Sequence, residues 1–223
     1  MPSHRDRLYV ALYARGGRAL MHGLEDTSVF IDWYRVGNFS YMARYHWALI
    51  VGPGPDLGPE SGGMRFHVKE AFNAASVPPW SQLAWAYEER NIGCDPTQML
   101  LVRVVIGKVL DIARLRCILG RVPIRSEVPG WNCVAWVREA IEEMLRDGKV
   151  LGAVSTSWEA VRDTAMWYVE QKKRAHRFDG QRQYMAKSQP TWDMLEGKET
   201  MESDNKDYRT AANISAVPAN PRR

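Results

Sequence analysis

Four segments of the chain have the hydrophobic pattern of β-strands. Residues 45–52 are apolar on both faces and predict a central strand, whereas residues 64–69 alternate, with His67 on the polar face. Residues 99–107 are rich in β-branched residues, which favour strands. The predicted strands span residues 7–14, 45–52, 64–69 and 99–107.

Three later segments repeat apolar residues at the spacing of amphipathic helices. They are bounded by residues typical of helix ends, such as Asn132 before the second helix and Gly120 after the first. The predicted helices span residues 111–119, 133–146 and a stretch that begins near 157. Residues 18–44 predict an irregular excursion that covers a site, and residues 71–98 predict mostly loop.

Together these elements predict an α+β fold in which helices pack on an antiparallel sheet. A chain of 223 residues can bury a substantial core without disulfides. We assign residues 1–198 to a single domain. Residues 199–223 are polar and rich in Pro and Asn, and they predict a flexible tail.

Composition narrows the functional classes only slightly. The net charge of +4 suits an anionic partner such as RNA, an acyl carrier or a lipid headgroup. The three cysteines are too few for a disulfide framework and form no paired zinc motif, so we expect a reducing, cytoplasmic location and neither metal nor other cofactor. No segment approaches the roughly 18 apolar residues of a membrane span, and no Gly-rich phosphate loop or serine-hydrolase motif is present.

Cys133 is the first candidate for chemistry, because it occupies the first turn of a predicted helix. Unpaired backbone N–H groups and the positive end of the helix dipole favour a thiolate there, and a thiolate is a nucleophile. The alternative is that Cys133 is a small buried hydrophobe on the same face as Val137, Ala140 and Met144.

His46 and His67 are candidates for the base and for the group that orients it. They lie on two strands that predict a hairpin with a long loop. In one register their side chains share a face, and a shift of one residue would place them on opposite faces. A thiol nucleophile needs such a base and a third group, and these are usually distant in sequence.

The order of these motifs resembles that of the lecithin retinol acyltransferase-like lipid acyltransferases, which have a permuted papain-like (NlpC/P60-type) fold. The likeness rests on His46-Trp47 with Val51-Gly52 behind them, on Phe66-His67-Val68 and on Asn132-Cys133. It implies Cys133 as nucleophile, His46 as base and His67 as the orienting residue. Backbone N–H groups at Asn132 and Val134 are then candidates for binding the oxyanion.

From Leu8 to Lys173 the chain is also similar to a large set of fungal proteins, and these include arginine-containing cyclodipeptide synthases. That likeness implies an acyl or aminoacyl substrate, with aminoacyl-tRNA as one form. Basic residues for phosphate contacts would be Lys172, Lys173, Arg174, Arg177 and Arg182. Candidates for substrate contacts are Trp47 and Trp131, together with Glu88, Glu89 and Asp95, whose carboxylates could bind a guanidinium.

Each of these interpretations has an alternative in the residues themselves. Cations complement the C-terminus of any helix, and the carboxylates could be solvated loop charges. A cysteine hydrolase or amidase would use the same residues as an acyltransferase. A non-catalytic protein that binds RNA or another protein through a Trp-rich surface is the competing class.

Overall fold

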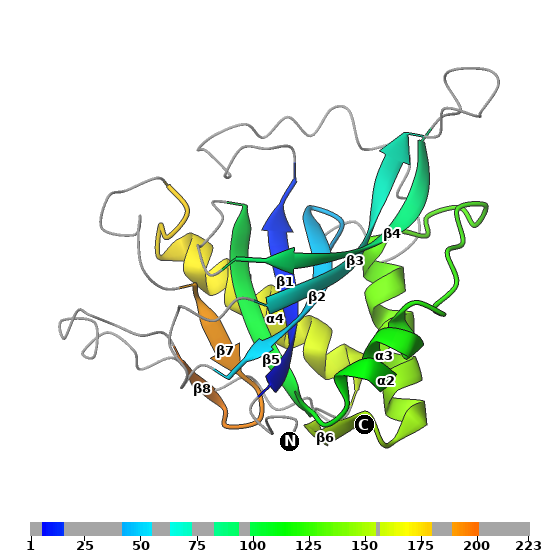
Figure 1. Ribbon diagram of the computed structural model, residues 1–223. Coiled ribbons are helices and arrows are strands. Elements are labelled where there is room, and N and C mark those ends of the chain that lie inside the picture. The colour runs from blue at the N-terminus through cyan, green and yellow to red at the C-terminus, as the bar shows by residue number, and fades with distance from the viewer. Residues whose placement is uncertain are drawn as a thin grey trace, which may run out of the picture.

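The computed structural model confirms the α+β class (Figure 1). It describes residues 6–15, 42–54, 63–72, 83–93, 99–154, 157–179 and 189–200. Within these ranges, eight strands form one mixed sheet and three helices pack against it. Apart from residues 42–44, the predicted excursion at 18–44 lies outside the described residues, as does the predicted tail beyond residue 200.

The sheet is antiparallel except where β5 and β7 run parallel. Its strand order is β4-β3-β2-β1-β5-β7-β8, and β6 pairs with β5 off this path. The strands are β1 (Asp6–Ala14), β2 (Tyr45–Pro53), β3 (Gly63–Phe72), β4 (Leu83–Ile92), β5 (Leu100–Val109), β6 (Leu151–Val154), β7 (Thr191–Asp193) and β8 (Lys198–Glu199).

The four predicted strands correspond to β1, β2, β3 and β5. The prediction of mostly loop over residues 71–98 was wrong for residues 83–92, because β4 pairs with β3 along its whole length. The charged run Glu88-Glu89-Arg90, which indicated a loop, instead lies on an edge strand whose side chains pair with neighbouring cations. Glu199, predicted to begin the tail, belongs to β8.

The helices begin where the predicted capping residues stand. They are α2 (Ile112–Leu119), α3 (Cys133–Asp147) and α4 (Trp158–Arg174). The side chains of Asp111, Asn132 and Ser157 each accept a hydrogen bond from a backbone N–H in the first turn that follows. Figure 1 shows α4 crossing behind β1 and β5, with α3 and α2 beside it.

The sheet separates two apolar clusters. Trp47 and Leu12 face the helices and pack with Val137 and Val161 in the main core. On the opposite face, a smaller cluster contains Tyr9, Ala11, Tyr13, Ala48, Ile50 and Val105. Since neighbouring residues of a strand point to opposite faces, the buried apolar side chains of β1 and β2 are divided between these two clusters.

Gly148 provides a test of how α3 ends. It has φ 66°, a left-handed conformation in which a Cβ is strained, although no atom within 4 Å would crowd a Cβ added there. We expect Gly148→Ala to lower the free energy of unfolding by about 1 kcal/mol in urea titrations. Gly93→Ala, equally uncrowded but without positive φ, should change it by less than about 0.5 kcal/mol; equal losses would contradict the assignment.

Candidate functional site

Cys133 occupies the position that the sequence predicted, at the first residue of α3. Asn132 precedes it in an extended conformation, and its side-chain oxygen accepts the N–H of Val134 at 2.8 Å. The Val134 N–H is therefore already bonded to the cap, which leaves Asn132 a positioning role in the structure. The Cys133 side chain is 0% exposed and belongs to the core beneath the sheet.

Two N–H groups point at the Cys133 thiol. Nη2 of Arg15 lies 3.4 Å from Sγ, and the backbone N–H of Trp47 lies 3.5 Å from it. The Nε of Arg15 also donates to the carbonyl oxygen of Tyr45 at 3.3 Å, which fixes the guanidinium between β2 and α3. Donors of this kind, one of them charged, suit a sulfur atom that carries negative charge.

His46, His67 and Glu88 form a chain of short hydrogen bonds. Nε2 of His46 lies 2.6 Å from Nδ1 of His67, and Nε2 of His67 lies 2.8 Å from a carboxylate oxygen of Glu88. The two histidines thus share a face of the sheet, as in one of the two predicted alternatives, although that alternative placed them directly opposite one another. The β2–β3 register pairs Leu49 with Phe66, so the histidines meet on a diagonal rather than directly opposite.

This chain of hydrogen bonds determines which ring nitrogen of His46 can accept a proton. Burial is the main cause that lowers the pKa of His67, and hydrogen bonds from Lys69 and His67 lower the pKa of Glu88 to about 2. A neutral His67 that donates to the Glu88 carboxylate accepts at Nδ1, so His46 donates from Nε2. The lone pair at Nδ1 of His46 is then the remaining acceptor.

The pKa of His46 is lowered to about 3, first by burial, then by its electrostatic interaction with His67, and then by the positive charges of Arg15 and Arg65. His46 is therefore neutral at physiological pH. Glu88 also contacts Lys69 at 2.6 Å and Arg65 at 3.3 Å. One carboxylate thus faces several cations around the histidine pair.

The thiol contacts the β2 backbone next to His46, because Trp47, whose N–H it accepts, directly follows His46. The β1–β2 register pairs Leu12 with Trp47 and Tyr13 with His46, so Trp47 faces α3 while His46 faces Tyr13 at a ring separation of 6.1 Å. In the described part of the chain, no hydrogen bond joins Cys133 to His46. Arg15 is the group that acts on both, through its hydrogen bond to the thiol and its charge near His46.

The structure uses both predicted substrate-contact tryptophans for packing. Trp47 is fully buried, packs against Trp158 and donates its indole N–H to the carbonyl oxygen of Met42 at 3.0 Å. Trp131 is 8% exposed and donates to Glu139 at 3.0 Å. Neither indole N–H is available to a ligand in this arrangement.

The predicted carboxylates are separated from one another. Glu88 belongs to the histidine chain, and Glu89 pairs with Arg116 of α2 at 2.7 Å. Asp95 lies outside the described residues. His67, which the motif order indicated as the orienting residue, contacts His46 directly, and Glu88 lies behind His67 as a further member of the hydrogen-bonded chain.

The basic residues at the end of α4 differ in their exposure and in whether a carboxylate compensates their charge. Lys172 pairs with Glu199 of β8 at 2.5 Å and lies over the ring of Tyr168, so its charge is compensated. Lys173 and Arg174 are exposed. Arg177 is partly buried near Tyr168, whose pKa its charge lowers against the larger effect of burial. Arg182 lies outside the described residues.

Sequence reasoning missed Arg15, Tyr13 and Arg65 as parts of this site. Arg15 directly follows a predicted strand, but 118 residues separate it from Cys133. Arg65 was visible only as a neighbour of His67. The alternation that placed His67 on the polar face of its strand also places Arg65 there, and that was the available signal.

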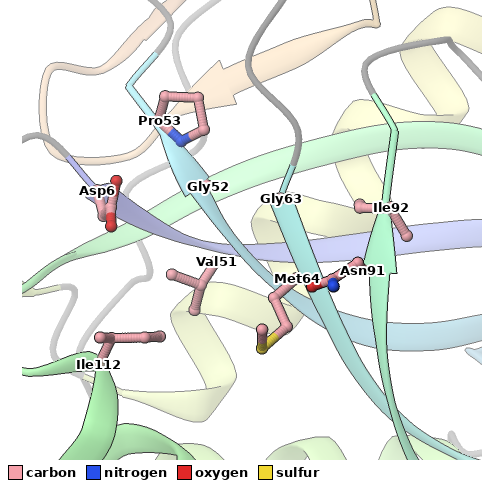
Figure 2. Close-up of a pocket in the computed structure, with 9 residues that line it drawn as sticks. All are labelled: Asp6, Val51, Gly52, Pro53, Gly63, Met64, Asn91, Ile92 and Ile112. Atoms are coloured by element: carbon pink, nitrogen blue, oxygen red, sulfur yellow. The ribbon is translucent and has the colours of Figure 1, made fainter.

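A hollow of about 340 Å³ lies at the opposite end of β2 (Figure 2). Figure 2 shows Asp6 and Ile112 on one side of it and Met64 and Asn91 on the other. Its further lining residues are Val51, Gly52, Pro53, Gly63 and Ile92. The hollow is thus distinct from the thiol and the histidines, which lie at the start of β2.

Among the residues described, no group of three or more His, Cys, Asp or Glu side chains is arranged to hold a metal ion. None of the helices in the same ranges combines the length and hydropathy of a transmembrane span.

Residues 5–201 match a family of unknown function, DUF6914, and the chain belongs to that family. No curated protein and no solved structure matches the chain. The family assignment covers β1 through β8 and therefore includes all residues of the site described above.

Acidification tests the environment of the histidine pair. Between the unfolded-state pKa of about 6.5 and the folded-state pKa of about 3, the unfolded chain binds more protons at His46 than the folded protein does. The free energy of unfolding should therefore fall as the pH falls, by about 2 kcal/mol from pH 7 to pH 5 for this one group. Glu88 stays ionised in this window and does not contribute.

Urea unfolding at both pH values would measure the effect in wild type, His46→Gln and the control His176→Gln. His176 lies on the surface and does not belong to the buried pair, so the fall in stability that His46 causes should persist when it is replaced. His46→Gln should reduce that dependence. An unchanged dependence in His46→Gln would show that other groups cause it.

Proposed function

We propose that this protein is a thiol-dependent acyl-transfer enzyme in which Cys133 is the nucleophile and His46 the base. The observation that carries the proposal is the surroundings of the thiol. It lies at the first turn of α3, receives two N–H donors, and touches the backbone of the residue that follows His46. A neutral imidazole with one open nitrogen at that point can accept a proton.

The proposed reaction has two steps. The Cys133 proton passes to Nδ1 of His46 as Sγ bonds to the acyl carbon, and the leaving group departs with the proton that His46 returns. The thioester is then attacked by water in hydrolysis, or by an amine or hydroxyl in transfer, with His46 removing the proton of the attacking group. The backbone N–H of Cys133 itself is the proposed donor to the oxyanion, because the N–H of Val134 is already bonded to the Asn132 side chain.

His67 and Glu88 are positioning residues in this proposal. Their hydrogen bonds fix the ring of His46 and direct its open nitrogen away from His67. Arg15 now contacts the thiol, so the proposal requires its guanidinium to turn aside when a substrate enters. Arg15 is exposed, and it follows β1 rather than lying within the sheet, so such a movement breaks no strand pairing.

The order of a His46 strand, a His67 strand and a later Cys133 helix supports a permuted papain-like arrangement of this α+β fold. Acyl donors of two classes fit: activated esters and aminoacyl groups carried on tRNA. For the second class, the exposed cations Lys173 and Arg174 are the proposed phosphate contacts, because Lys172 is already paired with Glu199. The proposed reaction needs no metal or cofactor, and its proposed location is the cytoplasm.

Intact-mass analysis tests the nucleophile. Wild type should gain the acyl mass when incubated with an activated acyl ester or with aminoacyl-tRNA, and Cys133→Ala should not. Cys117→Ala is the matched control, because Cys117 is an exposed cysteine on α2, and this variant should be acylated like wild type. His46→Asn should slow acylation by about 10²- to 10⁴-fold.

Two results would refute the proposal. One is an adduct that persists in Cys133→Ala, which would locate the reactive group elsewhere. The other is the absence of any adduct from either donor, together with a Cys133 that does not react with an alkylating reagent. That second result would favour a buried structural cysteine in a protein that binds its partner without catalysis.

A further inference from the structure

Two arginines flank small residues on the face of the sheet that carries His46. The register pairs Ala11 with Ala48 and also pairs Ala11 with Arg103, so Arg103 borders a floor of two alanines. On the other side, Arg65 pairs with Ile50. Alanine side chains end at Cβ, so the longer side chains of the neighbouring Arg65 and Arg103 can extend over them.

Both guanidinium groups lie against the tyrosines of β1. Cζ of Arg65 is 5.5 Å from the ring centre of Tyr13, and Cζ of Arg103 is 4.9 Å from that of Tyr9. Both charges reach Tyr13, since each lowers its pKa against the larger effect of burial. Two positive charges therefore converge on the hydroxyl of one buried residue.

The negative charge that would balance them is largely missing among the described residues. The side-chain hydrogen bond of Arg103 goes to the neutral hydroxyl of Thr191 at 3.2 Å, although burial is strong enough to lower the pKa of this arginine. Arg65 reaches Glu88 through Nη2, but Glu88 is shared with His67 and Lys69. Nε of Arg65 is buried and has no partner within the described ranges.

We propose that Arg65 and Arg103, together with the Tyr13 hydroxyl, bind an anionic oxygen group, a carboxylate or a phosphate, above Ala11 and Ala48. Both arginines are only partly buried, yet withdrawing a guanidinium from water remains unfavourable unless an anion compensates its charge. A carboxylate or phosphate accepts from several N–H donors at once. The site lies beside His46, so the anion belongs to the acyl substrate. That last step rests on the proposed function, whereas the binding itself needs no thiol.

Binding at this site would also change His46. The positive charge of Arg65 is one cause of the low pKa of His46, and a bound anion offsets that charge. The imidazole then becomes a stronger base only when the anionic group is present. A substrate that lacks the group is thereby disfavoured in the chemical step as well as in binding.

Thermal unfolding of the full-length Cys133→Ala variant, which cannot form a thioester at this residue, tests the site. The probes are inorganic phosphate, N-acetylglycine and its neutral analogue N-acetylglycinamide, all at constant ionic strength. We expect at least one anion to raise Tm by about 3 to 5 °C when it is tenfold above its dissociation constant. The neutral amide should leave Tm unchanged, and the anion that acts identifies carboxylate or phosphate as the ligand.

Charge-removing substitutions in the same background locate the binding. Arg103→Met and Arg65→Met should each abolish the rise, measured from the Tm of that variant alone, and Arg146→Met at the exposed end of α3 should preserve it. Arg103→Lys keeps the charge and should retain part of the rise if Arg103→Met does not fold.

No rise with either anion in Cys133→Ala would overturn the proposal, as would an equal rise in Arg65→Met or an equal rise with the neutral amide. These outcomes are independent of acylation. Anion binding without any thioester in wild type would retain the site and refute only the thiol chemistry. Thioester formation without anion binding would refute the anion site and retain the thiol chemistry.

Discussion

The pairing of β1 with β2 is the constraint on which the site depends. It sets Leu12 opposite Trp47 and Tyr13 opposite His46, and the alternation of a strand then sends these neighbours to opposite faces. A shift of one residue would place His46 in the apolar core and Trp47 among the arginines. The fully buried Trp47 opposes that shift, because exposing an indole to charged neighbours costs several kcal/mol of burial energy. The large aromatic thus maintains the position of the small catalytic candidate beside it.

A second constraint is the imbalance of charge on the face that carries His46. Arg65 and Lys69 lie beside the histidine pair, Arg103 lies by Tyr9 on the same face, and Glu88 is the carboxylate bonded to the pair. Under these conditions both histidines remain neutral, and the contact of His67 with Glu88 is a hydrogen bond to a charged acceptor rather than an ion pair. The histidine chain is therefore an arrangement of fixed donors and acceptors, in which one open nitrogen is left at its end.

Most of the fold was predictable from local patterns, and the site only in part. Apolar periodicity located β1, β2, β3, β5 and the helices, because burial on one or both faces leaves a regular signal. It failed for β4, an edge strand whose charged residues resemble a loop until their partners on β3 and α2 are known.

Among the functional candidates, Asn132 and Cys133 were predictable because a helix cap is a local signal. The sequence allowed His46 and His67 to share a face or to lie on opposite faces, and the pairing of Leu49 with Phe66 puts them on one face, on a diagonal rather than directly opposite. Arg15 was not predictable, since its contacts join β1 to β2 and to α3, and tertiary proximity of this kind leaves no periodic trace.

Arg15 also bears on whether Cys133 is more than a small buried hydrophobe. A thiol that serves only packing is satisfied by apolar neighbours, as its sulfur is a weak acceptor. A guanidinium that contacts the sulfur loses part of its hydration. Arg15 is exposed, so its side chain could keep that hydration by pointing into the solvent. Its Nε is held by the carbonyl oxygen of Tyr45, which orients the second nitrogen toward Sγ. The protein thus holds a positive charge beside the sulfur that is proposed as the nucleophile, and the same charge is one cause of the low pKa of His46.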